Sequence, residues 1–205
     1  MSAWRALFVL AGVLILAGGL PHPRGEMQQM LTDPNWVITH VLVTVGFVAL
    51  LAGLWSFGRG RELPKATRTW LGLALVGTGL QLIELIVHTV AVVDAQNLVG
   101  GQPTPVLSTH LALAVALYPV FGITMTGFII AAARDRVLGS PWIAPLGVIG
   151  AVAHALSAPL TVGFGIPWAW ILFPMMMLIA LWAAIVALLP GRAGAAHAEP
   201  RPSPI

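Results

Sequence analysis

Six long apolar runs alternate with short polar separators along the chain. The runs occupy residues 4–20, 36–57, 70–93, 106–133, 142–160 and 166–189. A helix that crosses about 30 Å of hydrocarbon needs about 20 residues at 1.5 Å per residue, within a range of about 17 to 25, and every run reaches that range. The pattern predicts an all-α integral membrane protein, a bundle of six transmembrane helices.

The separators are rich in residues that end helices. They include Pro21, Pro23 and Pro34 in the first, Gly60 and Pro64 in the second, and Gly100, Gly101, Pro103 and Pro105 in the third. Such residues are typical of turns, so we expect short loops. The stretch after Pro190 is rich in alanine, glycine and proline and has little to bury. We therefore expect one transmembrane domain over residues 1–190 and a disordered cytoplasmic tail over residues 191–205.

Composition points to the lipid bilayer as the surroundings of this chain. Of its 205 residues, 58% are hydrophobic and 8% are charged, whereas roughly a quarter are charged in soluble domains. The formal net charge of +3 does not indicate nucleic-acid binding, because the basic residues lie in the separators and form no patch interleaved with aromatic residues. The absence of cysteine excludes disulfides, thiolate metal ligands and covalent attachment of a c-type haem.

The basic residues fall unevenly on the two sides of the predicted bundle. Nine of the ten lie at the termini or in alternate separators, namely Arg5, Arg59, Arg61, Lys65, Arg68, Arg134, Arg136, Arg192 and Arg201. Only Arg24 falls on the opposite side. Because cytoplasmic loops carry the excess of lysine and arginine, we expect both termini in the cytoplasm. The chain is then a multi-pass protein of the inner (plasma) membrane of the cell.

The first apolar run has an alternative interpretation as a secretory signal. Arg5 precedes its apolar core, and the small residues Ala17, Gly18 and Gly19 follow, which is the order found in signal peptides. Removal of the run would leave five helices and an external N-terminus. We expect instead that it is retained as the first helix.

Tryptophans lie near the ends of the predicted helices. We expect Trp36, Trp168 and Trp170 at the outer membrane interface and Trp4, Trp55, Trp70, Trp142 and Trp182 at the inner one. Such an arrangement would form the aromatic belts that anchor membrane proteins.

Five ionisable residues lie inside the predicted helices: His40, Glu84, His88, His110 and His154. A charged group near the centre of the bilayer costs about 2.5 to 3.5 kcal/mol on insertion scales, so such groups usually face the interior of a bundle. Counted from the outer helix ends, the four histidines fall in one layer roughly 6 to 9 Å deep. Glu84 precedes His88 by one helical turn, so we expect its carboxyl group to face the interior beside that histidine.

The dipeptides Thr39-His40 and Thr109-His110 open equivalent inward-running helices, and the following helix carries His88 or His154 near its outer end. This predicts a repeat of the hairpins formed by the second and third and by the fourth and fifth helices. A pseudo-twofold axis along the membrane normal would relate them. It would pair His40 with His110 and His88 with His154 around a central site.

The histidines favour a non-covalent haem b as the first functional hypothesis. Imidazole is the usual axial ligand of haem in membrane bundles, where facing helices hold the cofactor. We expect one haem, with His40 and His110 as the axial pair and His88, His154 and Glu84 available for a second ligand, the propionates or proton transfer. Electron transfer or another membrane redox role would follow, with other membrane subunits or a quinone as partners.

Two other hypotheses fit the same residues. His40, His88, His110, His154 and Glu84 could form a zinc, copper or iron centre used for transport or catalysis, since imidazole and carboxylate suit these ions. Alternatively, the chain is a non-catalytic accessory subunit of a larger membrane complex. Its pairs Gly46 with Gly53 and Gly72 with Gly79 would then provide small faces for assembly. The sequence contains no motif that by itself identifies an enzyme.

Overall fold

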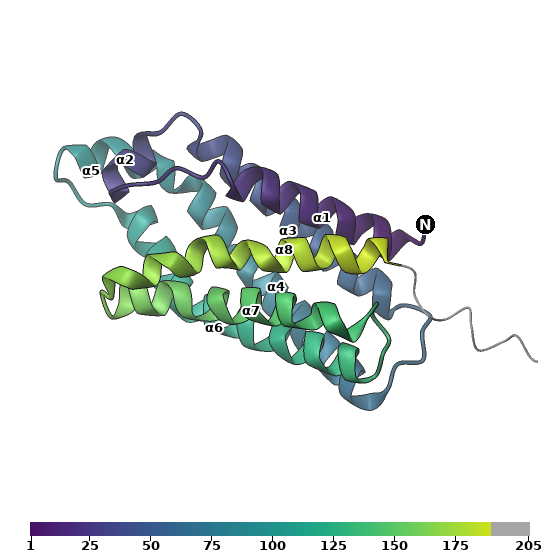
Figure 1. Cartoon of the computed structure of the whole chain (residues 1–205). Coiled ribbons are helices and arrows are strands. Elements are labelled where there is room, and N and C mark those ends of the chain that lie inside the picture. The colour runs from purple at the N-terminus through teal and green to yellow at the C-terminus, as the bar shows by residue number, and fades with distance from the viewer. Residues whose placement is uncertain (190–205) are drawn as a thin grey trace, which may run out of the picture.

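A computed structural model describes residues 1–189, and every regular element in that range is helical (Figure 1). The α-helices are α1 Ala3–Gly19, α2 Met27–Thr32, α3 Trp36–Gly58, α4 Lys65–Val90, α5 Ala95–Val99, α6 Pro105–Arg134, α7 Ala144–Ala158 and α8 Leu172–Leu188. Four shorter segments join or extend them, namely η1 Ala91–Asp94, η2 Pro141–Ile143, the π-helical η3 Pro159–Gly163, and η4 Pro167–Ile171. The predicted tail 191–205 lies outside the described residues.

The six long helices form a closed ring. Helix α1 packs against α3 and α8, α4 packs against α3 and α6, and α7 packs against α6 and α8. The start of α1 and the end of α8 lie at one end of the bundle, hereafter the terminal end, and the short helices α2 and α5 lie at the other, the capped end (Figure 1). The ring therefore has an interior that all six long helices share.

Five helical segments are long and apolar enough to cross a membrane. They are Trp36–Gly58, Lys65–Val99, Pro105–Arg134, Pro141–Gly163 and Pro167–Leu188. Helix α1 is also apolar, but its 17 residues make it shorter than each of these five segments. Length and composition thus mark the chain as a multi-pass membrane protein, as the apolar runs predict.

Small residues let neighbouring helices approach closely. A Cβ atom added to Gly12 of α1 would lie 2.5 Å from the carbonyl oxygen of Ala180 in α8, and one added to Gly150 of α7 would lie 2.5 Å from the backbone nitrogen of Ile179. Within a bilayer, where helix association depends on van der Waals contact, such approaches hold a bundle together. Gly46 also lies against α1, whereas Gly72 and Gly79 face open space.

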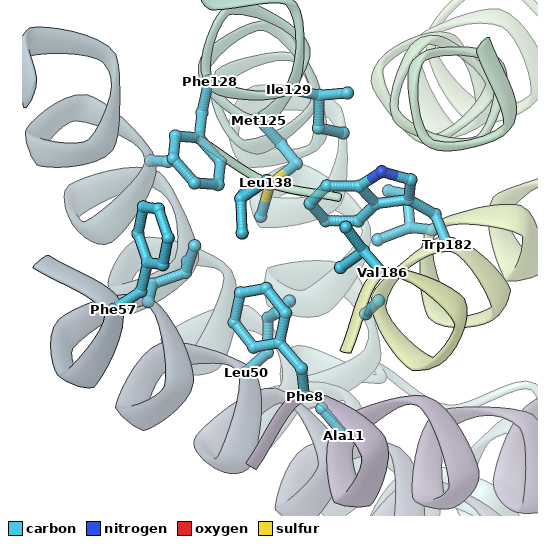
Figure 2. Packing of buried hydrophobic residues seen from close by; sticks show 14 of the residues in the cluster. Phe8, Ala11, Leu50, Phe57, Met125, Phe128, Ile129, Leu138, Trp182 and Val186 are labelled. Carbon is cyan, nitrogen blue, oxygen red and sulfur yellow. The ribbon is translucent and has the colours of Figure 1, made fainter. Parts of the chain in front are cut away.

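The terminal half of the ring is filled by large apolar side chains (Figure 2). Phe8, Phe57, Phe128 and Trp182 are almost completely buried there. The rings of Phe57 and Phe128 meet edge to face, with centroids 6.0 Å apart, a geometry that aromatic quadrupoles favour. This half of the bundle is an apolar core.

The prediction that the separators are loops is wrong for the first and the third. The first separator contains α2, and the third contains α5, which follows η1 at the end of the apolar run 70–93. Glu26 begins α2 with a capping box, in which its backbone N–H donates to Gln29 Oε1 at 3.2 Å. Helix α2 packs against α5 and η1. Helix formation over these short stretches covers the capped end of the bundle.

Three of the predicted interfacial tryptophans are instead buried. Trp4, Trp36 and Trp182 are at most 6% exposed, because their rings fill space inside the bundle. Trp142 and Trp168 are largely exposed, as a position at a membrane interface requires.

The helix order does not support the predicted hairpin repeat. A twofold axis that exchanged α3 with α6 and α4 with α7 would turn the extensive α4–α6 contact into an equally extensive α7–α3 contact. Helix α7 packs instead against α6 and α8, since α1 and α8 complete the ring. The Thr-His dipeptides of α3 and α6 are therefore not related by the internal symmetry that we predicted.

Candidate metal centre

Histidines from three long helices and one connecting segment meet beneath the capped end. His40 lies in the first two turns of α3, His88 near the end of α4, and His110 in the second turn of α6. His22 joins them from the segment between α1 and α2. The sequence predicted that His40, His88 and His110 lie at one depth. In the structure the His88 ring contacts the rings of the other two.

The four imidazoles form a continuous row. The centroids of His22 and His40 lie 4.7 Å apart, those of His40 and His88 4.2 Å apart, and those of His88 and His110 3.7 Å apart. His88 and His110 are stacked, with an interplanar angle of 20°. The Trp36 ring covers His40 at 4.1 Å. His88 thus lies between His40 and His110.

The hydrogen bonds of His22 and His40 fix their tautomers. His22 Nδ1 donates to the carbonyl oxygen of Pro23 at 2.7 Å, and His40 Nδ1 donates to that of Trp36 at 2.6 Å. A carbonyl can only accept, so each Nδ1 carries the hydrogen and each Nε2 of a neutral ring carries a lone pair. Burial lowers the pKa of His22 and favours its neutral form.

These two lone pairs face each other. The Nε2 atoms of His22 and His40 are 3.1 Å apart. Two neutral acceptors at this distance repel each other unless a proton or a cation lies between them. Metal-binding histidines show the same arrangement, because their second ring nitrogen usually donates to a backbone carbonyl or carboxylate. Together, His22, His40 and His88 offer one possible metal-ligand atom each, and these three atoms lie within 4.8 Å of one another.

Glu84 lies behind His88 and His110 and is fully buried, which confirms the prediction that it faces the interior. Its Oε1 atom is 2.7 Å from His110 Nδ1 and 3.6 Å from His88 Nδ1. None of these three buried atoms has the alignment of a hydrogen bond with a described residue. Their convergence forms a second group of donors, which shares His88 with the first.

His154 does not lie in the predicted layer. Its Nε2 donates to Gln81 Oε1 at 3.2 Å, and Gln81 precedes His88 by seven residues, or about 10 Å along the helix. The prediction is wrong here because α7 continues through η3 to Gly163, so His154 lies further from the end of its helix than the apolar run indicates. The predicted pairing of His88 with His154 is likewise not formed.

Gln81 still links His154 to the histidine row. Its amide nitrogen donates to Glu84 Oε2 at 2.6 Å, while its oxygen accepts from His154. Tyr118 packs on the His154 ring, with centroids 4.3 Å apart. A chain of buried polar contacts therefore runs from His154 through Gln81 and Glu84 to His110.

Sequence reasoning missed His22 because it lies outside the apolar runs. A signal was nevertheless present. His22 stands between Pro21 and Pro23, directly after the first run, at the same predicted end of the bundle as the other histidines. Two prolines restrict the backbone and allow a short connection to hold one side chain in place.

A cavity of about 690 Å³ adjoins the histidine row. His22, His40, His88 and His110 line it, as does His154. It lies in the interior of the ring, since residues of all six long helices contribute to its wall.

No protein-family model, curated protein or solved structure matches the chain.

Proposed function

We propose that this chain is a membrane metalloprotein in which His22, His40 and His88 bind one transition-metal ion. The observation that carries the proposal is the distance of 3.1 Å between the Nε2 atoms of His22 and His40. Both rings are oriented by a hydrogen bond from Nδ1 to a backbone carbonyl group, so both Nε2 lone pairs are available to a metal ion. Two nitrogen ligands of a tetrahedral ion lie about 3.3 Å apart when each bond is 2.0 to 2.1 Å long. Neutral imidazoles suit zinc, copper or iron.

The surroundings favour a centre that acts on a ligand over a purely structural one. Structural zinc sites use four protein ligands, whereas three leave a coordination position open. The cavity lies beside these three histidines. Glu84, 3.6 Å from His88 Nδ1, is the carboxylate that would orient this ring from behind. We therefore propose metal-dependent binding or chemistry of a membrane-soluble molecule.

Haem b receives less support from the same geometry. A porphyrin between His40 and His110 would have to occupy the place of His88, which lies 4.2 Å from one ring and 3.7 Å from the other. The neighbouring cavity is the observation that favours an organic group. Haem and the accessory-subunit role are therefore the alternatives that the experiment below must separate from the metal centre.

We further propose that α1 is a sixth span and that the terminal end faces the cytoplasm. Seven of the eight basic residues within the described range lie in α1, in the α3–α4 region or in the α6–α7 region at that end, and Arg24 alone lies at the other. This distribution follows the positive-inside rule. The histidine site then lies in the outer half of the membrane. A C-terminal tag that reacts from outside intact cells would contradict this orientation.

The test is elemental analysis and an absorption spectrum of the purified protein and two variants. We expect about one zinc, copper or iron ion per chain, its loss in His22→Ala, and its retention in His154→Ala. His22 discriminates well, because it belongs to the proposed metal site but not to the histidines expected to bind haem. A Soret band that persists in His22→Ala would replace the metal centre with haem. A protein without metal or haem would leave the accessory-subunit role.

A further inference from the structure

The cavity beside the histidines extends along the helices. On α3 its wall extends from His40 to Phe47, and on α6 from His110 to Tyr118. These intervals of seven and eight residues correspond to about 10 to 12 Å at the rise of an α-helix. Its volume of about 690 Å³ lies within the range of about 300 to 1,000 Å³ typical of ligand pockets. The cavity thus reaches from the histidine row into the interior of the ring and has room for the apolar chain of a lipid.

Most ionisable residues of the wall lie at the capped end, among apolar residues such as Met27, Met30 and Trp36. At the capped end it contains the row of four histidines and Arg24. At the deeper end it contains Ile15, Phe47, Ile179 and Ala180. His154 and Tyr118 are the polar residues of the deeper part, and the His154 Nε2 is already bonded to Gln81. A molecule that matches this wall has a polar group at one end and an apolar chain at the other.

Small side chains keep the middle of the cavity open. Ala114 of α6 and Ala158 of α7 are buried and line it, where larger apolar residues would fill the space, as they do in the terminal half of the ring. Apolar cavities of such size forfeit the van der Waals contacts that close packing provides. An occupant would restore those contacts.

We propose that the cavity binds a single-chain membrane lipid with an oxygen-bearing head group, a fatty acid or a prenylated quinone. The apolar chain lies between the long helices, and the head group faces His22, His40 and His88. The position of the head group at the open side of a metal ion rests on the proposed function. The binding of the chain in the cavity does not.

Photo-crosslinking tests the proposal with two pairs of probes added to the purified full-length protein. One pair is palmitate with a diazirine near the carboxyl group or near the methyl end, and the other is a prenylated benzoquinone labelled at the ring or at the tail. We expect head-labelled probes to react near His22 and His40 and tail-labelled probes to react near Ile15 and Phe47. Reaction of only one pair would identify the source of the head group.

A matched pair of variants on α6 tests the site itself. Ala114→Phe fills the cavity, and we expect it to lower labelling at least fivefold while the metal content is unchanged. Ala116 is exposed on the same helix, so Ala116→Phe should label like the wild type. Labelling confined to outward-facing residues such as Ile86 and Ile123, or equal labelling of both variants, would overturn the proposal.

The two proposals fail separately. If the protein contains metal but neither pair of probes labels the cavity, the lipid site is wrong and the metal centre stands. If the protein contains no metal, yet Ala114→Phe abolishes labelling that the wild type shows with the expected polarity, the lipid site stands and the metal centre is wrong.

Discussion

The same six helices form two dissimilar halves of the bundle. In the terminal half, Phe8, Phe57, Phe128 and Trp182 fill the interior and pack ring against ring (Figure 2). In the capped half, the interior contains a cavity of about 690 Å³ and a row of four imidazoles. A continuous helix such as α3 therefore contributes Phe57 to a closed core and His40 to an open site.

The comparison indicates that the terminal half stabilises the fold and that the capped half binds the ligand. The terminal half has few polar groups to satisfy, so its contacts can hold the ring together without any ligand. Within residues 1–189, buried polar atoms without an aligned hydrogen bond are more numerous in the capped half, at Trp36, Glu84, His88 and His110, than in the terminal half, at Trp4 and Thr126. Such atoms are costly in a bilayer unless a bound ion or ligand satisfies them. We expect substitutions in the two halves to affect different measurements.

The largest effect on folding should come from the core. Phe128→Ala should lower the free energy of unfolding by about 3 kcal/mol, the lower end of the range for such changes, because transfer from water contributes less inside a bilayer. Phe47 lines the cavity and has fewer neighbours to lose, so Phe47→Ala should cost about half as much. Equilibrium unfolding in mixed micelles measures both. Equal losses would remove the contrast between the two halves.

His40→Ala should have the converse effect. It removes one of the three proposed ligands, and we expect metal affinity to fall by more than about 100-fold, beyond the range of about 10- to 100-fold seen when supporting residues are removed. The core should keep its unfolding free energy when wild type and variant are compared without metal. Titration with zinc or copper against a competing chelator gives the affinity. A metal affinity equal to that of the wild type would exclude His40 as a ligand.

Glu84→Gln should have a smaller effect on the same affinity. The amide retains the shape of the side chain but replaces one carboxyl oxygen beside His88 and His110 with an NH2 group, so we expect a loss of about 10- to 100-fold. Asp94→Asn is the matched control, since Asp94 is also buried and its carboxylate accepts a hydrogen bond from the backbone of Leu107 at 2.9 Å and not from a histidine. If both variants lose the same affinity, Glu84 has no specific role at the site.

The apolar runs predicted the long helices well because a membrane imposes a simple length and composition on each of them. The predicted run 36–57 and helix α3 Trp36–Gly58 differ by one residue. The short helix α2 escaped prediction, because six residues give no clear periodic signal and its capping box is local. The long helices were therefore predictable from the sequence, whereas the short helices α2 and α5 that cover the capped end were not.

The candidate site was predictable only in part, since residue depth follows from sequence while contact depends on helix order. His40, His88 and His110 could be placed together by counting residues from helix ends. His22 could not, because it reaches the site from a connecting segment. The stacking of His88 on His110 follows from the packing of α4 against α6, an adjacency that no pattern within either helix specifies.

The smallest effect tests whether the deeper part of the cavity communicates with the metal site through buried polar contacts. Gln81 receives a hydrogen bond from His154 and gives one to Glu84, so it is the single described side chain that joins the deeper histidine to the metal site. In a double-mutant cycle, Gln81→Leu and His154→Phe should each lower metal affinity less than tenfold. The double variant should lose less metal-binding free energy than the sum of the two single losses. We expect a coupling free energy of about 1 kcal/mol, as found for residues in one hydrogen-bond network. The reason is that Gln81→Leu already removes the side chain that connects His154 to Glu84, so His154→Phe has little further effect on the site. Thr78→Val combined with His154→Phe supplies the control, because Thr78 is also buried on α4 but bonds to the carbonyl of Ala74. Strict additivity of the Gln81 and His154 substitutions would show that His154 is a packing residue, independent of the site.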